Sequence, residues 1–119
     1  MNSEEQKIFD LEHGMMIFGN DKEMLGLIIK DFIQNAPADL DALEAAVGNM
    51  LVEETERYAH RLVGAAGMIG AMKLMDLARQ METDAKEGRL KRADLMLRTL
   101  KDEFVSFKCE IETQGFEKP

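Results

Sequence analysis

Apolar residues recur at intervals of three and four positions along most of this chain, and this spacing constrains its fold more than any other feature. Side chains three and four positions apart lie on one face of an α-helix, so each such segment predicts an amphipathic helix. Proline occurs only as Pro37 and Pro119 and tryptophan is absent, while residues that favour helices outnumber β-branched ones. The pattern therefore predicts an all-α protein.

Glycine, asparagine and proline interrupt this pattern and mark the expected ends of the helices. Asn20 or Asp21 offers an N-cap for a long amphipathic helix. Because proline fits the first turn of a helix, Pro37 indicates either a new helix or a kink in a continuing one. The helices expected from these signals cover residues 10–18, 20–35, 37–48, 51–69, 74–88 and 90–113.

Long helices joined by short turns pack as antiparallel neighbours, and four of them form an up-down-up-down bundle. The expected fold class is therefore all-α: an antiparallel four-helix bundle with one or two additional short N-terminal helices, the first laid across one end. A length of 119 residues suits one domain. Residues 1–8 and 114–119 lie outside the expected helices, and we expect them to be frayed ends.

The charge of the chain is unevenly distributed. The formal net charge is −8, which argues against nucleic acid as a partner, because surfaces that bind nucleic acid are basic. Residues 57–92 nevertheless hold eight basic and four acidic side chains. This basic stretch of an acidic protein is either a docking surface or a set of solvated helix faces.

The cysteine count and the lack of long apolar stretches limit the disulfides and the cellular location expected for this chain. Cys109 is the only cysteine, which rules out an intramolecular disulfide, and we expect it to be partly buried in a helix. No stretch approaches the roughly 20 apolar residues of a membrane span, and the polar start of the chain lacks a signal-peptide core. We therefore expect a cytoplasmic protein without membrane insertion.

The segment over residues 59–70, AHRLVGAAGMIG, combines a histidine with glycines on one predicted helix. Gly64 and Gly67 follow His60 by four and seven positions, so these three residues share a helical face. A glycine inside a helix costs about 0.8–1 kcal/mol relative to alanine. This face is therefore expected to be kept bare, so that something large reaches the imidazole. The alternative is a histidine with only a structural role.

The residues around this histidine favour phosphoryl transfer over other chemistry. A neutral imidazole nitrogen is a nucleophile, and His60 lies in the basic stretch of the chain. The chain has no glycine-rich phosphate loop, and its two histidines, His13 and His60, are too isolated to predict a zinc site. Ordinary enzyme chemistry is therefore not expected. The imidazole is able to accept a phosphoryl group if its other ring nitrogen holds the right tautomer and cations offset the charge, and a structural histidine remains the alternative.

A larger pattern around this segment resembles the histidine-containing phosphotransfer (HPt) domain. It runs Ala59-His60-x-Leu62-x-Gly64-x-Ala66-x-x-x-Gly70-x-x-x-Leu74 and continues with Leu77, Met81 and Glu82. An earlier segment, residues 14–32, is similar to the N-terminal part of the same family. The resemblance thus covers most of the chain.

This resemblance implies roles for the residues near the histidine. His60 becomes the phosphoacceptor, and Gly64 leaves room for the phosphoryl group. Glu82 is placed to accept a hydrogen bond from Nδ1–H, so that Nε2 is the nucleophile. Lys86, one helical turn further on, is placed to help neutralise the phosphate. The remaining neighbours are expected at the face that docks the partner: Arg57, Arg61, Gly67 and Met68.

One position departs from the family pattern. HPt domains usually have a lysine three residues after the histidine, and this chain has Val63. Arg57 or Arg61 is a candidate for supplying the missing charge. Val63 also favours the alternative function, a non-catalytic helical interaction module that binds a receiver or a kinase as a scaffold without phosphotransfer.

The function implied by the resemblance is that of a phosphorelay intermediate in a multistep two-component system. Such a protein accepts a phosphoryl group on its histidine from the aspartate of one receiver domain and passes it to the aspartate of another. The expected partners are response-regulator receiver domains, a hybrid sensor histidine kinase, or both. The receiver supplies Mg²⁺, so no cofactor or metal of this chain is expected. We expect a monomeric phosphocarrier without kinase or hydrolase activity of its own.

Overall fold

The structure, a computed structural model, describes residues 6–116, and the chain there forms α-helices joined by turns, with no strand. The helices are α1 (Leu11–Ile17), α2 (Lys22–Gly48), α3 (Val52–Met68), α4 (Met72–Lys86) and α5 (Ala93–Thr113). Asp10 caps α1 and Asp21 caps α2, each with a side-chain oxygen 3.0 Å from the backbone nitrogen three residues on. The prediction of an all-α fold is confirmed.

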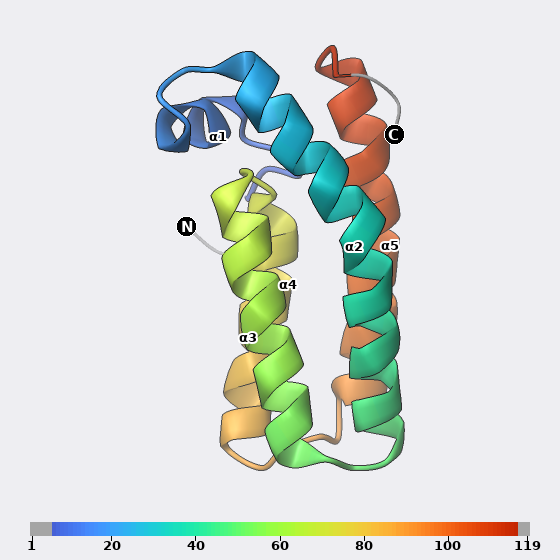
Figure 1. The fold of residues 1–119 in the computed structure, drawn as a ribbon. Helices are drawn as coiled ribbons and strands as arrows, with labels where there is room; N and C mark the ends of the chain where they lie inside the picture. Colours follow the sequence, from blue (N-terminus) through green and yellow to red (C-terminus); the bar gives the residue numbers. More distant parts are fainter. Residues whose placement is uncertain (1–5, 117–119) are drawn as a thin grey trace.

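The four long helices form an antiparallel bundle, and α1 lies across one end of it (Figure 1). Short turns join α2 to α3 and α3 to α4, which makes consecutive helices antiparallel neighbours. Helix α5 packs against both α4 and α2 and so closes the bundle. The predicted up-down-up-down topology is therefore confirmed, with one additional short N-terminal helix.

Helix α2 passes through Pro37 without ending. The separate helix expected over residues 37–48 is therefore wrong, and the alternative of one continuing helix is correct; its axis bends along its length in Figure 1. A proline inside a helix costs about 3 kcal/mol. The residues on either side of it, Ile33, Ala36 and Leu40, are all buried. Burying one large apolar side chain contributes about 1.5–3 kcal/mol, so packing against the core keeps α2 continuous.

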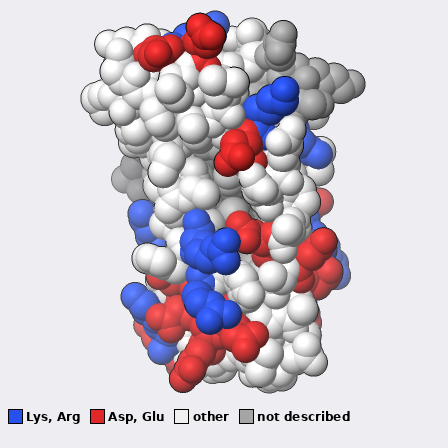
Figure 2. Space-filling view, in the orientation of Figure 1, with Lys and Arg blue, Asp and Glu red and all other residues white. Residues whose placement is uncertain are grey.

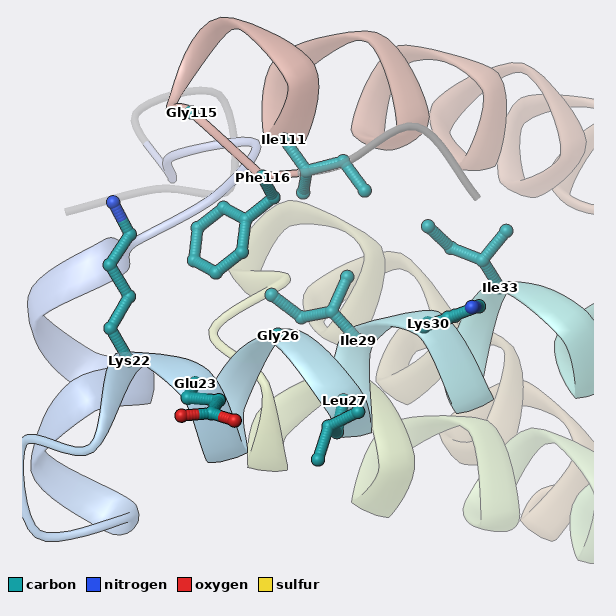
Figure 3. A pocket seen from close by; sticks show the side chains of 10 residues that line it. All are labelled: Lys22, Glu23, Gly26, Leu27, Ile29, Lys30, Ile33, Ile111, Gly115 and Phe116. Carbon is teal, nitrogen blue, oxygen red and sulfur yellow. The ribbon is translucent and has the colours of Figure 1, made fainter.

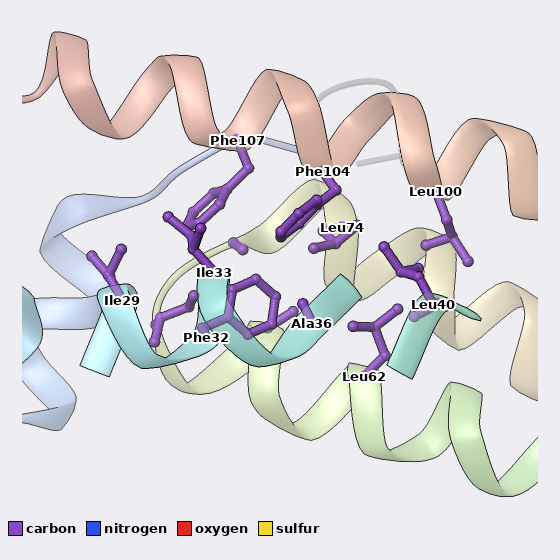
Figure 4. Close-up of a cluster of buried hydrophobic side chains, with 14 of the residues drawn as sticks. Ile29, Phe32, Ile33, Ala36, Leu40, Leu62, Leu74, Leu100, Phe104 and Phe107 are labelled. Carbon is purple, nitrogen blue, oxygen red and sulfur yellow. The ribbon is translucent and has the colours of Figure 1, made fainter. Parts of the chain in front are cut away.

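The core of the bundle consists of the predicted apolar faces of the helices (Figure 4). The ring of Phe32 on α2 meets that of Phe107 on α5 edge to face, with ring centroids 5.8 Å apart, a geometry that aromatic pairs prefer. On α3 the buried residues include Ala59 and Leu62. Their burial fixes the rotation of α3 and leaves His60 at the edge of the buried stripe.

The turn between α3 and α4 holds α1 in place. The backbone N–H of Asp10 donates to the carbonyl of Gly70 at 2.7 Å, and Gly70 has a φ of +82°. A Cβ at Gly70 would overlap the carbonyl oxygen of Asp10, so both the conformation and the close approach require glycine. In α1, a Cβ at Gly14 would lie 3.1 Å from the carbonyl oxygen of Ile69. These contacts place α1 directly on the end of α3.

Residues at both ends of the described chain pack against the bundle. The ring of Phe116 lies edge to face with that of Phe9, with centroids 5.7 Å apart, and Ile8 packs against the core. These contacts differ from the expectation of frayed ends at these positions. The same expectation covered residues 1–5 and 117–119, which lie outside the described residues.

A groove of about 550 Å³ separates the first half of α2 from the end of α5 (Figure 3). Its apolar lining includes Ile29, Ile111 and Phe116, and two lysines of α2, Lys22 and Lys30, line it as well. This groove shares no residue with the surroundings of His60, so it plays no part in the site described below.

The sequence led to one expectation about Cys109 and another about membrane-spanning helices. Cys109 is exposed rather than partly buried, because it lies on the outer side of α5 while Phe107 and Ile111 face the core. Among residues 6–116, no helix combines the length and the apolar character that crossing a membrane requires.

Candidate functional site

His60 lies on α3 with its side chain 73% exposed, beside a carboxylate of the neighbouring helix. Its Nδ1 is 2.6 Å from Oε2 of Glu82 on α4, and the Glu82 side chain is only 12% exposed. A carboxylate accepts hydrogen bonds, so the ring donates through Nδ1–H, and Nε2 of the neutral ring keeps its lone pair. The predicted neighbour Glu82 is therefore in contact with His60, and the free ring nitrogen faces solvent.

An open hollow of about 390 Å³ surrounds this pair. The residues that line it come from the first half of α3 and the second half of α4: Glu53, Glu56, Arg57, His60, Glu82 and Lys86. Three carboxylates thus share the hollow with two cations. The structure brings together the predicted residues Arg57, Glu82 and Lys86 around His60.

Glu53 and Glu56 are site residues that the sequence analysis missed. They precede His60 by seven and four positions, the same helical spacing that associated Gly64 and Gly67 with it. This spacing is visible in the sequence, but acidic residues on an exposed helix face of an acidic protein are ordinarily surface charge. Their presence makes the hollow more acidic than the basic stretch around it suggested.

The two glycines near the histidine have different surroundings. A Cβ at Gly64 would meet nothing within 4 Å, so this position is bare as expected. A Cβ at Gly67 would lie 2.9 Å from Sδ of Met75 on α4, and the Gly67 carbonyl accepts a hydrogen bond from Nε2 of His13 at 3.0 Å. The interpretation of Gly67 as part of a bare face is therefore wrong, because Met75 of α4 occupies the space that a side chain here would need.

The two arginines of α3 differ in their distance from the site. Arg61 forms an ion pair with Asp39 of α2 at 3.4 Å, and its guanidinium lies 5.8 Å from the ring centroid of Tyr58. The structure therefore directs Arg61 towards α2 and does not bring it to the hollow. Arg57 lines the hollow, and its guanidinium lies 5.1 Å from the same ring centroid.

The remaining predicted positions lie outside the hollow. Val63 is partly buried and packs against the core. Met68 is 47% exposed at the end of α3, about two turns beyond His60.

The charges on the face seen in Figure 2 are unevenly distributed. Basic side chains gather over its middle and lower part, flanked by acidic ones, and little charge lies over α1 and the adjoining end of α3.

Two buried carboxyl groups away from the hollow have shifted pKa values. The hydrogen bond that Arg92 donates at 2.9 Å, assisted by Arg89, lowers the pKa of Asp84, while burial acts in the opposite direction. Burial raises the pKa of Glu103, which the ammonium of Lys73 at 3.9 Å only partly opposes. Oε2 of Glu103 has no hydrogen-bond partner among the described residues. These groups affect the stability of the bundle rather than the chemistry at His60.

Comparison with known proteins identifies the family. Residues 27–106 match the sequence model of the Hpt domain, which is more than half of the chain. The chain belongs to the Hpt domain family. The resemblance found in the sequence is therefore confirmed, and membership of this family gives the chain a role in histidine phosphotransfer within a phosphorelay.

One solved structure supports the same fold. The crystal structure of histidine-containing phosphotransfer protein B (HptB) from Pseudomonas aeruginosa PAO1 matches this Hpt domain with a TM-score of 0.82. The two chains are 19% identical, and the match covers 90% of this chain and 93% of HptB. A search of curated proteins gave no match. At this identity the likeness establishes the shared fold, and the site residues are argued from their own geometry.

Proposed function

We propose that His60 is the residue of this Hpt domain that carries the phosphoryl group. The observation that supports this is the difference between its two histidines. His60 exposes Nε2 to solvent and holds its other nitrogen against Glu82. The ring of His13 is partly buried and uses Nε2 to bind the carbonyl of Gly67. A nucleophile needs a lone pair that the reacting phosphorus atom is able to approach, and the exposed ring of His60 allows this approach better than the partly buried ring of His13.

The proposed transfer starts from an aspartyl phosphate on a receiver domain. The lone pair of His60 Nε2 attacks phosphorus, and the N–P bond forms as the P–O bond to the aspartate breaks. The aspartate leaves with the electron pair of that bond as a carboxylate. The proton stays on Nδ1, where the carboxylate of Glu82 accepts its hydrogen bond and stabilises the positive charge that develops on the ring. Transfer to a second receiver reverses these steps.

The surroundings of His60 fit the approach of a second protein domain. The bare surface at Gly64 leaves space beside the ring, and the side chains of Arg57 and Met68 are exposed on the same helix. A receiver domain, alone or within a hybrid sensor histidine kinase, is the proposed partner on both sides of the transfer. We propose that the receiver also provides the Mg²⁺, so that this chain contributes the nucleophile and the docking surface as a monomer in the cytoplasm.

A second candidate function is a scaffold that binds a receiver or kinase without accepting phosphate. The observation that favours it is Val63, an apolar residue at the position where the family usually has a lysine. Binding of a phosphorylated receiver without transfer of label distinguishes this candidate from the first.

The experiment mixes this protein with receiver domains of the same organism that carry a radiolabelled aspartyl phosphate. The protein is expected to acquire a label that is stable in base and lost in acid. His60→Gln should abolish this uptake, and the matched control His13→Gln should retain it. Label on the His60→Gln variant, or loss of label only in the His13→Gln variant, contradicts the assignment. Circular dichroism of both variants checks that the bundle remains folded.

A further inference from the structure

We infer that the groove between α2 and α5 is a binding site for a long-chain carboxylate, such as a free fatty acid. Its alkyl chain lies along the apolar lining of the groove, and its carboxylate binds a lysine of α2. The groove has no residue in common with the hollow around His60, so this site is independent of the proposed function. The lining of the groove, its dimensions and the charges at its rim all support the assignment.

The lining of the groove is mostly apolar (Figure 3). The side chains of α2, of α5 and of the residue beyond the end of α5 that face it include Ile29, Ile33, Ile111 and Phe116. At Gly26 the helix presents no side chain, and a Cβ there would lie 3.5 Å from the ring of Phe116. Apolar surface that is open to water favours a ligand that covers it with hydrocarbon.

The dimensions of the groove suit a single alkyl chain. Its volume of about 550 Å³ lies within the range of small-molecule sites. A helix with its side chains is about 10–12 Å across, so two turns of one need more space than this. The lining residues of α2 extend from Lys22 to Ile33, which is about 16 Å along the helix axis. An extended chain of about twelve carbons has a similar length, because a carbon–carbon bond is about 1.5 Å long.

Two lysines of α2 place positive charge at the rim of the groove. The ammonium of Lys22 lies 5.2 Å from the ring centroid of Phe116 and 3.7 Å from the position that a Cβ at Gly115 would take. Lys30 lines the groove about two helical turns further along α2. No ion pair found within residues 6–116 involves either lysine. Each ammonium is therefore able to bind a carboxylate of a ligand without breaking an ion pair among these residues.

One acidic residue, Glu23, also lines the groove. In Figure 3 its carboxylate points away from Phe116, whereas the side chain of Lys22 extends on the same side as this ring. The groove thus carries two positive charges and one negative charge, in a protein whose formal net charge is −8. Cations beside apolar surface favour an amphiphile with an anionic head over a neutral or cationic one.

The test titrates the full chain with dodecanoate, kept below the concentration at which it forms micelles. Two-dimensional ¹H–¹⁵N NMR should show saturable shifts of the amide signals of Gly26, Lys30 and Gly115, with a dissociation constant in the micromolar range. Octanoate should bind about tenfold more weakly, because its shorter chain buries fewer methylene groups in the open groove. Dodecyltrimethylammonium has the same alkyl chain with a cationic head and should also bind about tenfold more weakly, because the lysines repel it.

Variants of the lining locate the bound ligand. The double variant Lys22→Met and Lys30→Met should weaken dodecanoate binding about tenfold, since each charge contact in a partly solvated site changes the affinity by up to about fivefold. Lys91→Met, which removes an exposed lysine in the turn before α5, is the matched control and should bind like the unsubstituted protein. Gly26→Leu should abolish binding by filling the groove, and circular dichroism checks its fold. The double lysine variant changes only exposed side chains, so the inference remains testable if Gly26→Leu does not fold.

Four results would overturn this assignment. The groove is not the site if dodecanoate causes no saturable shifts, or if the double lysine variant binds it as tightly as the Lys91→Met control. The anionic head is not recognised if dodecanoate and dodecyltrimethylammonium bind equally. If the protein sediments with phosphatidylglycerol vesicles but does not bind monomeric dodecanoate, the lysines contact an anionic membrane surface instead and the inference is wrong.

Discussion

Replacing Gly64 by alanine is expected to stabilise this Hpt domain, whereas the same change at Gly67 is not. Gly64 lies in the interior of α3, and a Cβ there meets nothing within 4 Å. The full difference in helix propensity, about 0.8–1 kcal/mol, should therefore appear in the free energy of unfolding. For a chain of this length that corresponds to a rise of about 4 °C in the unfolding temperature.

The comparison with Gly67 isolates the packing contribution. Both glycines lie in α3, but Gly67 is in its last turn, so its gain in helix propensity is no larger than that at Gly64. At Gly67, however, the added Cβ would lie 2.9 Å from Sδ of Met75, which must move. Overpacking of this kind costs about 1–3 kcal/mol, although the flexible thioether of methionine absorbs part of it. Gly67→Ala should therefore leave the unfolding temperature unchanged or lower it.

Circular dichroism measures the unfolding temperatures of both alanine variants. A larger substitution at Gly64 then tests whether the bare surface is needed for phosphoryl transfer. Gly64→Leu should remain folded, yet it should slow phosphoryl transfer from a receiver at least tenfold, because the leucine side chain occupies the space beside His60. The reasoning is refuted if Gly64→Ala lowers the unfolding temperature, or if the two alanine variants shift it equally. Normal transfer by a folded Gly64→Leu variant would show that the bare surface is not needed for docking.

Three further predictions concern charges in and around the bundle. Glu103→Leu should raise stability at pH 7 by about 1–2 kcal/mol in urea unfolding, because it removes a buried carboxylate that Lys73 compensates only partly. Burial raises the pKa of Glu103, so the native state binds the extra proton and the gain should shrink as the pH falls towards 5. Asp84→Asn should destabilise the protein at pH 7, and since arginine hydrogen bonds lower the pKa of Asp84, the difference should fade in pH titrations below about 4. Val63→Lys should lengthen the phosphohistidine lifetime a few-fold relative to the unsubstituted protein, as measured by ³¹P NMR, because a charge contact in a partly solvated site contributes about 1 kcal/mol or less.

The sequence predicted most helix boundaries because capping and stop signals act locally. Asp21 caps α2 through a bond to a backbone nitrogen three residues away, and such a signal is visible in a short segment. The continuity of α2 through Pro37 was not decided in the same way. It depends on burial of the flanking residues against α5 and α3, and periodicity alone does not tell how strongly a partner helix holds a proline-containing segment in place.

Side chains of the site that contact residues on another helix were harder to predict than side chains whose contacts are local in the sequence. The pairing of His60 with Glu82 was implied only through the family resemblance, because the two residues are on different helices and 22 positions apart. Arg61 was placed near the histidine on the basis of proximity in sequence. Its actual partner, Asp39, lies on α2, and nothing in the residues around Arg61 indicates which neighbouring helix it faces.

The difference between the two histidines also arises from tertiary packing, since both lie in helices and the contacts of each ring come from another helix. His13 is held because α1 rests on the α3–α4 turn, where Gly70 admits the backbone of Asp10 and brings the His13 ring to a carbonyl of α3. The same packing leaves the middle of α3 uncovered, and there Glu82 binds only one nitrogen of His60. An acceptor that occupies Nδ1 and leaves Nε2 free is what separates a reactive imidazole from a structural one in this bundle. If α1 detached from the α3–α4 turn, His13 would lose its bond to the Gly67 carbonyl but would gain no carboxylate partner, and it would remain a poor substitute for His60.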